Sequence, residues 1–368
     1  MLDTISFLMK AKRIAASGFV GAKEAEELCH LIGGGESLTI DFSAVSGVNF
    51  AAQRAFLRAR KSGLKFNIVN ASPEIAGQFE DSGVASFVNV CRRSEPLDMS
   101  IYEEFGASYM SKAYNSADGN SMIKVYGPRV PVEAVEREKV VARAVMRFGI
   151  ATPLVGSLYS DGQNNALSFE RIEGKRSFSR IISEEPDRLE EITRRFAVMC
   201  KELHSTECDT AIFSDRSLFY RSFVEADTVL GPEVRARALA FLDGVPSATT
   251  CLHGDMQLSN VITNGSEDMW IDLGDFSYGN HMFDMGMWYF LCKLNNEEHA
   301  LSLFHLHKAD LDRIWDIFIE EYFGLHDPES IKAVTSEIEP FAALHMIYLG
   351  TAYRYEPWMP EYIKRIFK

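Results

Sequence analysis

The sequence has no long apolar run, and its cysteines form no pairs. A run of about 18 apolar residues is missing, so no transmembrane helix is expected. The N-terminus places a short apolar stretch before basic residues, the reverse order of a secretory signal. Six cysteines lie among apolar neighbours without a CxxC motif, which predicts buried free thiols in a reducing compartment. A cytoplasmic protein with no membrane partner is therefore expected.

Positive charge is also scarce. The 38 Lys and Arg residues are outnumbered by 52 Asp and Glu residues, and the net charge is -14. Nucleic acid is not an expected partner, because binding to a phosphate backbone requires clustered Lys and Arg. The composition, with 46% hydrophobic and 24% charged residues, is typical of a globular chain. A length of 368 residues is too great for one ordinary core, so two or three domains are expected.

The first ninety residues alternate short strand-like runs with helix-like ones. Residues 37–42 and 64–69 have the pattern of strands, and residues 51–62 have apolar residues at helical spacing. Ser72 followed by proline opens another helix. A third strand is expected over residues 85–90. Strands that alternate with helices across short loops predict a parallel sheet covered by helices.

The pattern changes after a polar stretch at residues 92–96. Residues 101–126 predict antiparallel strands, residues 131–148 predict a helix, and further strands follow. Long helices dominate from residue 186, interrupted by a strand-rich island at residues 251–279. A small β-rich lobe, one helix and then a large helical lobe is the layout of a two-lobed kinase.

The strand-rich island carries most of the candidate chemistry. Asp255 and Asn260 lie on one loop between apolar strand residues, and Asp272 and Asp275 follow another strand. Phosphoryl transfer requires a carboxylate that orients the acceptor hydroxyl and oxygen ligands that hold Mg²⁺ on the phosphates. Asp and Asn are also common in ordinary turns. Two such loops in this order favour a metal–phosphate centre over two unrelated turns.

These two loops resemble the signature of the aminoglycoside phosphotransferase and choline kinase superfamily. The matching pattern is HGDxxxxN, which starts at His253, followed by IDxxDxxxG. It is similar to the protein-kinase catalytic loop with HGD in place of HRD, and the resemblance runs from about residue 100 to the C-terminus. It implies that Asp255 is the catalytic base, that Asn260 and Asp272 bind Mg²⁺, and that His253 braces the loop. Asp284 matches another aspartate of the family, and a helix N-cap is its favoured interpretation.

By the same resemblance, a lysine on the third small-lobe strand and a glutamate on the next helix should hold the α- and β-phosphates of ATP. Lys124 is central in an apolar strand, where an unpaired ammonium group would be costly. Glu136 and Glu138 follow on the helix and point to different faces, so only one can reach Lys124. Alignment with the family favours Glu138, and Glu136 stays an alternative.

Two further segments complete the expected nucleotide site. The phosphate-covering loop has one glycine where protein kinases have three, and Ser108 and Ser111 are its candidates for contact with the phosphates. A plain hairpin is the alternative for this loop. The connection between the lobes should bond the adenine edge through its backbone, with Glu170 and Ile172 at the best positions.

The N-terminal region, residues 1 to about 92, resembles a STAS domain. The resemblance rests on the strand pattern of residues 38–45, the helix after Phe50 and the strand at residues 64–69. Regulated members carry a phosphorylated Ser or Thr at the start of that helix, whereas this chain has Ala51 and Ala52. A docking or dimerising role is therefore expected in place of a phosphorylation switch.

The expected fold class is α/β plus α+β. A STAS-like β-α domain over residues 1–95 precedes a kinase-like small lobe over 96–172 and a mainly helical large lobe over 173–368. The expected function is ATP- and Mg²⁺-dependent transfer of the γ-phosphoryl group to a hydroxyl of a small molecule. A protein Ser/Thr kinase and a nucleotide-sensing regulatory protein are the alternatives. Expected partners are the hydroxyl acceptor and, through the STAS-like domain, another protein or a second copy.

Overall fold

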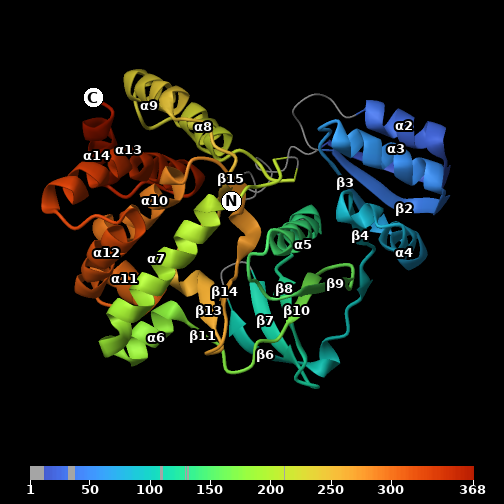
Figure 1. Cartoon of the computed structure of the whole chain (residues 1–368), viewed down its shortest axis with the longest axis horizontal. Helices are drawn as coiled ribbons and strands as arrows, with labels where there is room; N and C mark the ends of the chain where they lie inside the picture. Colours follow the sequence, from blue (N-terminus) through green and yellow to red (C-terminus); the bar gives the residue numbers. More distant parts are fainter. Residues whose placement is uncertain (1–11, 32–37, 108–110, 129, 131, 211) are drawn as a thin grey trace. The chain divides into compact units, whose positions relative to one another are not determined.

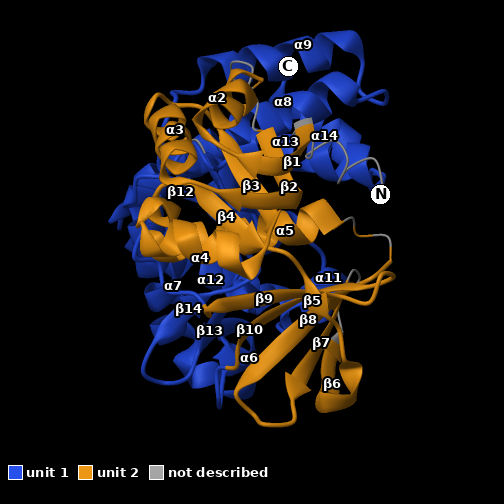
Figure 2. Cartoon of the chain, turned by 90° about the vertical axis from the view of Figure 1, so that its right-hand side faces the viewer, with its two compact units in different colours: residues 1, 148–152, 172–368 blue, residues 2–147, 153–171 orange. Residues whose placement is uncertain are grey.

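Figure 1 shows the computed structural model of the chain. The residues that it describes are 12–31, 38–107, 111–128, 130, 132–210 and 212–368. They divide into two units, coloured separately in Figure 2. The N-terminal unit contains the described residues up to Arg147 together with Pro153–Arg171, and the C-terminal unit contains Phe148–Thr152 and Ile172–Lys368.

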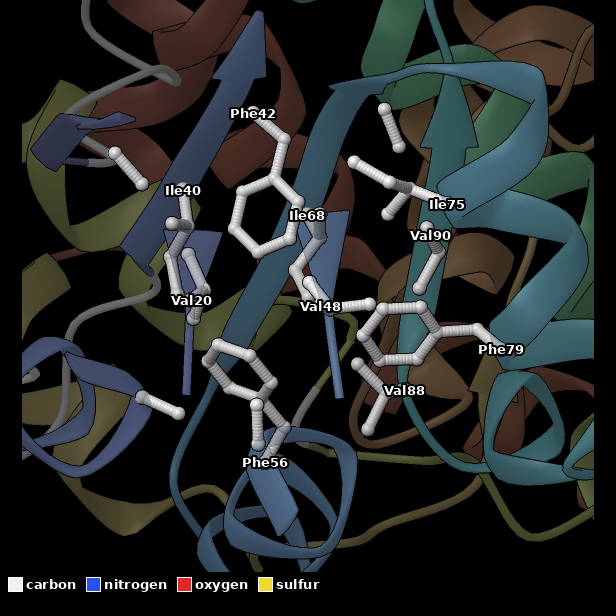
Figure 3. Packing of buried hydrophobic residues seen from close by; sticks show 14 of the residues in the cluster. Val20, Ile40, Phe42, Val48, Phe56, Ile68, Ile75, Phe79, Val88 and Val90 are labelled. Atoms are coloured by element: carbon white, nitrogen blue, oxygen red, sulfur yellow. The ribbon is translucent and has the colours of Figure 1, made fainter. Parts of the chain in front are cut away.

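The N-terminal unit begins with a parallel sheet in the order β1-β2-β3-β4, as the strand–helix alternation predicted. Its strands are β1 (Lys12–Val20), β2 (Leu38–Val48), β3 (Phe66–Ala71) and β4 (Asn89–Arg92). The helices between them are α2 (Ala22–His30), α3 (Phe50–Lys61) and α4 (Pro73–Asp81). All three helices contribute to one core on one face of the sheet, where Phe56 packs against Phe42 and Phe79 (Figure 3).

Local signals account for the starts of two helices. The side chain of Asn49 accepts a hydrogen bond from the Ala52 amide at 2.8 Å and caps α3. Ser72 accepts from the Ile75 amide at 3.2 Å and caps α4, with Pro73 in the first turn. The predicted helices over residues 51–62 and after Ser72 are confirmed.

The predicted strand over residues 85–90 starts too early, and only its last two residues lie in β4. A 3₁₀ turn at Val84–Ser86 follows the left-handed Gly83, and β4 starts only at Asn89. The apolar run is divided between two elements. Val84 and Ala85 pack into the core from the turn, and the strand begins after them. Strand β1 and helix α2 were not predicted, since register shifts at residues 15/17 and 18/19 break the two-residue alternation of β1.

A second sheet of six strands follows in the order β5-β9-β10-β8-β7-β6. Its strands are β5 (Glu95–Pro96), β6 (Tyr102–Ala107), β7 (Ser111–Ser116), β8 (Ser121–Tyr126), β9 (Val155–Ser160) and β10 (Asn165–Glu170). All pairings are antiparallel except that of β5 with β9, which confirms the antiparallel strands expected over residues 101–126. Helix α5 (Val132–Arg147) connects β8 to β9 and packs Val135 against Leu158 and Leu167.

Both sheets belong to the N-terminal unit. The predicted boundary near residue 95 therefore falls inside this unit, between its two sheets. The separation of the two units lies at Arg171 and Ile172, with residues 148–152 assigned to the C-terminal unit. The division into three domains stays a prediction.

The C-terminal unit is mainly helical, as predicted. Its helices are α6 (Phe178–Glu184), α7 (Leu189–Ser205), α8 (Arg216–Ala226), α9 (Pro232–Gly244), α10 (Met282–Tyr289), α11 (Glu297–Phe304), α12 (Lys308–Phe323), α13 (Pro328–Ala352) and α14 (Met359–Ile366). The short strands β11 (Arg176–Ser177), β12 (Cys251–Leu252), β13 (Val261–Thr263), β14 (Asp268–Trp270) and β15 (Ser277–Tyr278) form two small sheets. Phe196 of α7 packs against Trp270, Trp288 and Phe318, so the helices and the β-island share one core.

Two expectations from composition can be compared with the structure. All six cysteines are free and buried, as their apolar neighbours predicted. Among the described residues, no helix combines the length and the apolar character that a membrane crossing requires.

Candidate active site

The first loop of the candidate site connects β12 to β13 and holds two of its functional side chains together. Asp255 Oδ2 accepts hydrogen bonds from Asn260 Nδ2 at 2.9 Å and from Gln257 Nε2 at 3.0 Å. Asn260 Nδ2 also donates to the backbone oxygen of Asp255 at 2.8 Å. The five-residue spacing thus closes the loop on itself. It leaves the amide oxygen of Asn260 as the side-chain atom that could bind a metal ion.

The second loop follows β14 and presents Asp272. This residue has a left-handed backbone, with φ at 58°, and its side chain is exposed. A left-handed conformation is uncommon for residues other than glycine, although Asp and Asn tolerate it best. Its neighbour Ile271 donates from its amide to the backbone oxygen of Asn260 at 2.9 Å. The two loops are therefore joined directly by their backbones.

His253 contacts both loops from the buried side. Its ring is fully buried, and Nε2 donates to the Ile271 oxygen at 3.0 Å. The other ring nitrogen, Nδ1, accepts from the Asp255 amide at 3.3 Å. Burial lowers the pKa of His253, which favours the neutral ring that one donor and one acceptor require. The sequence predicted this residue, and its contacts are those of a structural brace.

Gly254 permits a close approach of the two loops. Its φ is +81°, and a Cβ atom added there would lie 2.2 Å from the backbone oxygen of Asp275. No side chain fits in that space, so close packing requires the glycine of the HGD pattern. Arg216 of α8 is buried against the same point and donates from Nη2 to the Gly254 oxygen at 2.7 Å.

Asp284 has a different role from the one predicted. It lies inside the first turn of α10 and is not the N-cap of this helix, so the N-cap interpretation is wrong. Its two carboxylate oxygens accept from the backbone amides of His253 at 2.8 Å and Gly254 at 3.0 Å. His204 Nε2 donates to it at 3.1 Å, and the Nδ1 atom of His204 lies 2.8 Å from the Tyr322 hydroxyl.

The pKa of Asp284 is lowered despite its burial. Burial by itself would raise its pKa, but the hydrogen bond from His204 and the charge of the nearby Arg216 act against burial, and the pKa is lowered. An anion with two accepted amides holds the HGD backbone in one conformation. Asp284 therefore fixes the loop that carries Asp255 from the helical core.

The carboxyl group of Asp255 has the opposite electrostatic setting. Burial raises its pKa, and the negative charge of Asp272 raises it further. The hydrogen bonds from Gln257 and Asn260 act in the other direction. A carboxylate with a raised pKa accepts a proton more readily, which suits a general base.

The oxygen donors of these two loops are of the kind that a magnesium ion binds. Among the described residues no group of three His, Cys, Asp or Glu side chains forms a closed metal cage. Mg²⁺ in phosphoryl-transfer sites uses one or two protein oxygens together with substrate phosphates and water. The Asp272 carboxylate and the Asn260 amide oxygen provide such a donor pair. A cation there would offset the repulsion between Asp255 and Asp272.

The N-terminal unit holds the predicted lysine and its partner. Lys124 Nζ on β8 lies 3.0 Å from Glu138 Oε1 on α5, with both side chains largely buried. Glu136, the alternative partner, points elsewhere and lies 3.1 Å from Arg13 Nη1 of β1. The structure thus pairs Lys124 with Glu138, and the role of this pair in nucleotide binding stays a prediction.

The remaining predicted positions are more dispersed. Ser108 lies outside the described residues, and Ser111 opens β7, where it pairs with Tyr126 of β8. The Glu170 amide donates to the Leu154 oxygen at 2.8 Å, and its carboxylate accepts from the Leu154 amide at 3.1 Å. Those groups of Glu170 are therefore engaged within β10 and its neighbour. Ile172 belongs to the other unit and is buried with Ile262 and Met269.

Sequence reasoning missed Arg216 and the His204–Tyr322 pair. Arg216 stands at the start of an ordinary amphipathic helix, where nothing local distinguishes it from a surface arginine. His204 occupies the buried face of α7, four residues after Cys200, where the sequence indicated a helix-surface or packing residue. Their functional contacts come from segments 38 and 80 residues away, which no local pattern encodes.

One protein family matches a large part of this chain. The model of the Phosphotransferase enzyme family matches residues 115–314, more than half of the chain. The comparison with curated proteins found no match.

Solved structures with a similar fold include two of aminoglycoside phosphotransferase APH(4)-Ia. The apo form of a thermostable mutant is 11% identical, with a TM-score of 0.52 over 73% of this chain and 94% of that one. Its ternary complex with ADP and hygromycin B is 10% identical, with a TM-score of 0.53 over 73% and 93%. A choline/ethanolamine kinase family protein from Mesorhizobium loti is 16% identical, with a TM-score of 0.44 over 72% and 85%. The β-rich part and the helical part thus form a protein-kinase-like fold, and the chain belongs to the Phosphotransferase enzyme family.

Proposed function

We propose that this protein transfers the γ-phosphoryl group of ATP, with Mg²⁺, to a hydroxyl group of a small molecule. The observation that carries the proposal is the direct backbone contact between the Asp255 loop and the Asp272 loop, which brings acidic and amide side chains onto two adjoining loops. Family membership supports phosphoryl transfer, and one structural neighbour is a complex with ADP and a small molecule, hygromycin B.

Each side chain has a role in this proposal. Asp255 accepts or orients the proton of the acceptor hydroxyl, and its raised pKa suits that task. Asn260 and Asp272 hold Mg²⁺, which when bound neutralises charge on the phosphates. Lys124, supported by Glu138, holds the α- and β-phosphates. His253, Asp284 and Arg216 do not touch substrate and instead keep the loops in position.

Catalysis in such a site is mainly positioning and charge neutralisation. The loops are well suited to positioning because they are tied to each other and to the helical core at several backbone atoms. The amides of His253 and Gly254 are fixed by Asp284, and the oxygen of Gly254 is fixed by Arg216. Asp255 follows directly, so its carboxylate is presented from a rigid backbone.

The test is an ADP-release screen over hydroxyl-bearing metabolites and aminoglycoside antibiotics, with a peptide library as the protein-kinase arm. We expect ADP release with a small-molecule acceptor and Mg²⁺. The Asp255→Asn variant should lose roughly 10²–10⁴-fold in kcat while its affinity for Mg²⁺ and ATP is nearly unchanged.

Asp316→Asn is the matched control, because it makes the same change at an exposed position of α12. Normal turnover by Asp255→Asn would remove Asp255 from the mechanism. Acceptance of peptides alone would replace the small-molecule assignment with a protein kinase.

The N-terminal region is proposed to be a STAS-like domain over residues 1–95 that contacts another protein or a second copy. A parallel sheet with its helices on one face supports this resemblance. Ala51 and Ala52 at the start of α3 agree with a role other than a phosphorylation switch. The oligomeric state of the full chain, measured by light scattering, tests self-association.

A further inference from the structure

The second face of the parallel sheet is covered, although α2, α3 and α4 all lie on the first. Strand side chains alternate, so Val69 and Cys91 point away from the core that contains Ile68 and Val90. Both are nevertheless only 2% exposed. Parallel sheets are generally buried on both faces. Some other element must therefore lie against this second face.

That element is α5, which lies between the two sheets of the N-terminal unit in both Figure 1 and Figure 2. Arg143 of α5 donates to the Val90 oxygen of β4 at 3.1 Å. Arg147, one turn later, donates to the backbone oxygens of Ala85 at 2.6 Å and Ser86 at 3.3 Å. The C-terminal half of α5 is thus attached to the backbone around β4.

Arg13 attaches the N-terminal half of α5. Its Nη1 atom donates to Glu136 at 3.1 Å and to Glu133 at 3.4 Å. The other side of the guanidinium binds Asp41 of β2, through Nε at 3.2 Å and Nη2 at 2.7 Å. Asn70 of β3 donates to the other oxygen of Asp41 at 3.2 Å. Arg13 therefore links three strands of the sheet to the helix.

The contact between Arg13 and Glu136 is not an ordinary surface ion pair. The Glu136 side chain is 5% exposed, and its Oε1 atom has no hydrogen-bond partner among the residues that the structure describes. Its bond to Arg13 is therefore the interaction that compensates for the burial of this carboxyl group. Loss of one partner from such a buried pair costs much more than loss of an exposed one.

The opposite side of the same helix carries the ion pair with Lys124. Residues two apart on a helix point about 200° away from each other, so Glu136 faces the parallel sheet while Glu138 faces β8. A helix is stiff over one turn. A displacement of Glu136 from Arg13 therefore also moves Glu138 relative to Lys124.

We propose that the parallel sheet positions the Lys124–Glu138 ion pair by holding α5, and that Arg13 is the positioning residue at the centre of this support. The inference rests on the proposed function, because it assigns Lys124 to the nucleotide. It gives the N-terminal sheet a role inside the chain, independent of any partner. The sheet becomes part of the apparatus that binds ATP.

The experiment uses the full chain with Arg13→Ala, Arg143→Gln and the control Arg58→Ala. Arg58 of α3 forms an exposed ion pair with Glu26 of α2, at 3.0 Å, on the face of the sheet opposite α5. Affinity for a non-hydrolysable ATP analogue with Mg²⁺ is measured by calorimetry, and amide hydrogen exchange reports on α5. Arg13→Ala and Arg143→Gln should weaken nucleotide binding by roughly 2–30-fold and speed exchange in α5. Arg58→Ala should do neither.

A double-mutant cycle separates positioning from general damage. In a Lys124→Ala background, Arg13→Ala should cause no further loss of nucleotide affinity, because the ion pair that it supports is already absent. Arg13→Lys should recover part of the loss, since it keeps the charge.

Folded Arg13→Ala protein with unchanged affinity and unchanged α5 exchange would overturn the inference, and so would full additivity in the cycle. If the unaltered protein bound no nucleotide, the proposed function would fail separately. The exchange measurement would then still decide whether the sheet holds α5.

Discussion

Glu136 should make the stability of the N-terminal unit depend on pH. Burial raises the pKa of Glu136 from 4.5 to about 7, although the Arg13 charge acts in the opposite direction. Between these two values the folded state binds more protons than the unfolded state, so stability falls as pH rises. The stabilisation of the folded state by protonated Glu136 is complete below pH 4.5 and is lost as the pH rises through 7. At about 1.4 kcal/mol per unit, the loss has an upper limit of about 3 kcal/mol.

The Glu136→Gln variant tests this magnitude because it removes the titration and keeps an acceptor for Arg13. All four tryptophans, at positions 270, 288, 315 and 358, belong to the C-terminal unit, so fluorescence reports on the wrong part of the chain. Hydrogen exchange of the α5 amides is the suitable assay. The exchange rate of the variant is divided by that of the unaltered protein at each pH from 5 to 8. This ratio of exchange rates should change by up to about 100-fold over the range, which corresponds to about 3 kcal/mol.

Glu133→Gln is the control, because Glu133 contacts the same guanidinium from the same helix but is 42% exposed, against 5% for Glu136. Its ratio to the unaltered protein should stay nearly flat with pH. If the Glu136→Gln ratio were equally flat, the carboxyl group would not be the source of the pH dependence, and the burial argument would be wrong.

Two predictions concern the C-terminal unit, where tryptophan fluorescence during urea unfolding is the measurement. Asp284→Ala leaves two buried amides and His204 without their acceptor, so it should destabilise this unit by about 3–5 kcal/mol; a change below about 1 kcal/mol would contradict the bracing role. Gly254→Ala should cost about 2–4 kcal/mol, the sum of a left-handed alanine and a clash with the Asp275 oxygen. Gly265→Ala, also left-handed but with no atom within 4 Å, should cost only about 1 kcal/mol, and equal effects at the two glycines would refute the close-approach argument.

Features that depend on neighbouring residues were predictable from the sequence. The caps at Asn49 and Ser72 act over three residues, and the predicted helices begin where those caps lie. The hydrogen bond between Asp255 and Asn260 spans five residues, so the HGDxxxxN pattern contains both residues that form it. The strand predicted over residues 85–90 starts too early, which shows the limit of local patterns. An apolar run fits a 3₁₀ turn and a short strand equally well.

The sequence alone thus determined the local chemistry of this protein: which loop carries Asp255 and Asn260, and which strand carries Lys124. Only the tertiary structure decided how these pieces are supported. Asp284 was expected to be an N-cap and instead anchors the loop that carries Asp255, because His253 and Gly254 approach it from about 30 residues away. Glu136 and Glu138 are two residues apart, yet each found its partner through a different sheet, 123 residues back for Arg13 and 14 for Lys124. The direction of each glutamate side chain follows from the helix, but the residue that it meets there depends on how distant segments pack.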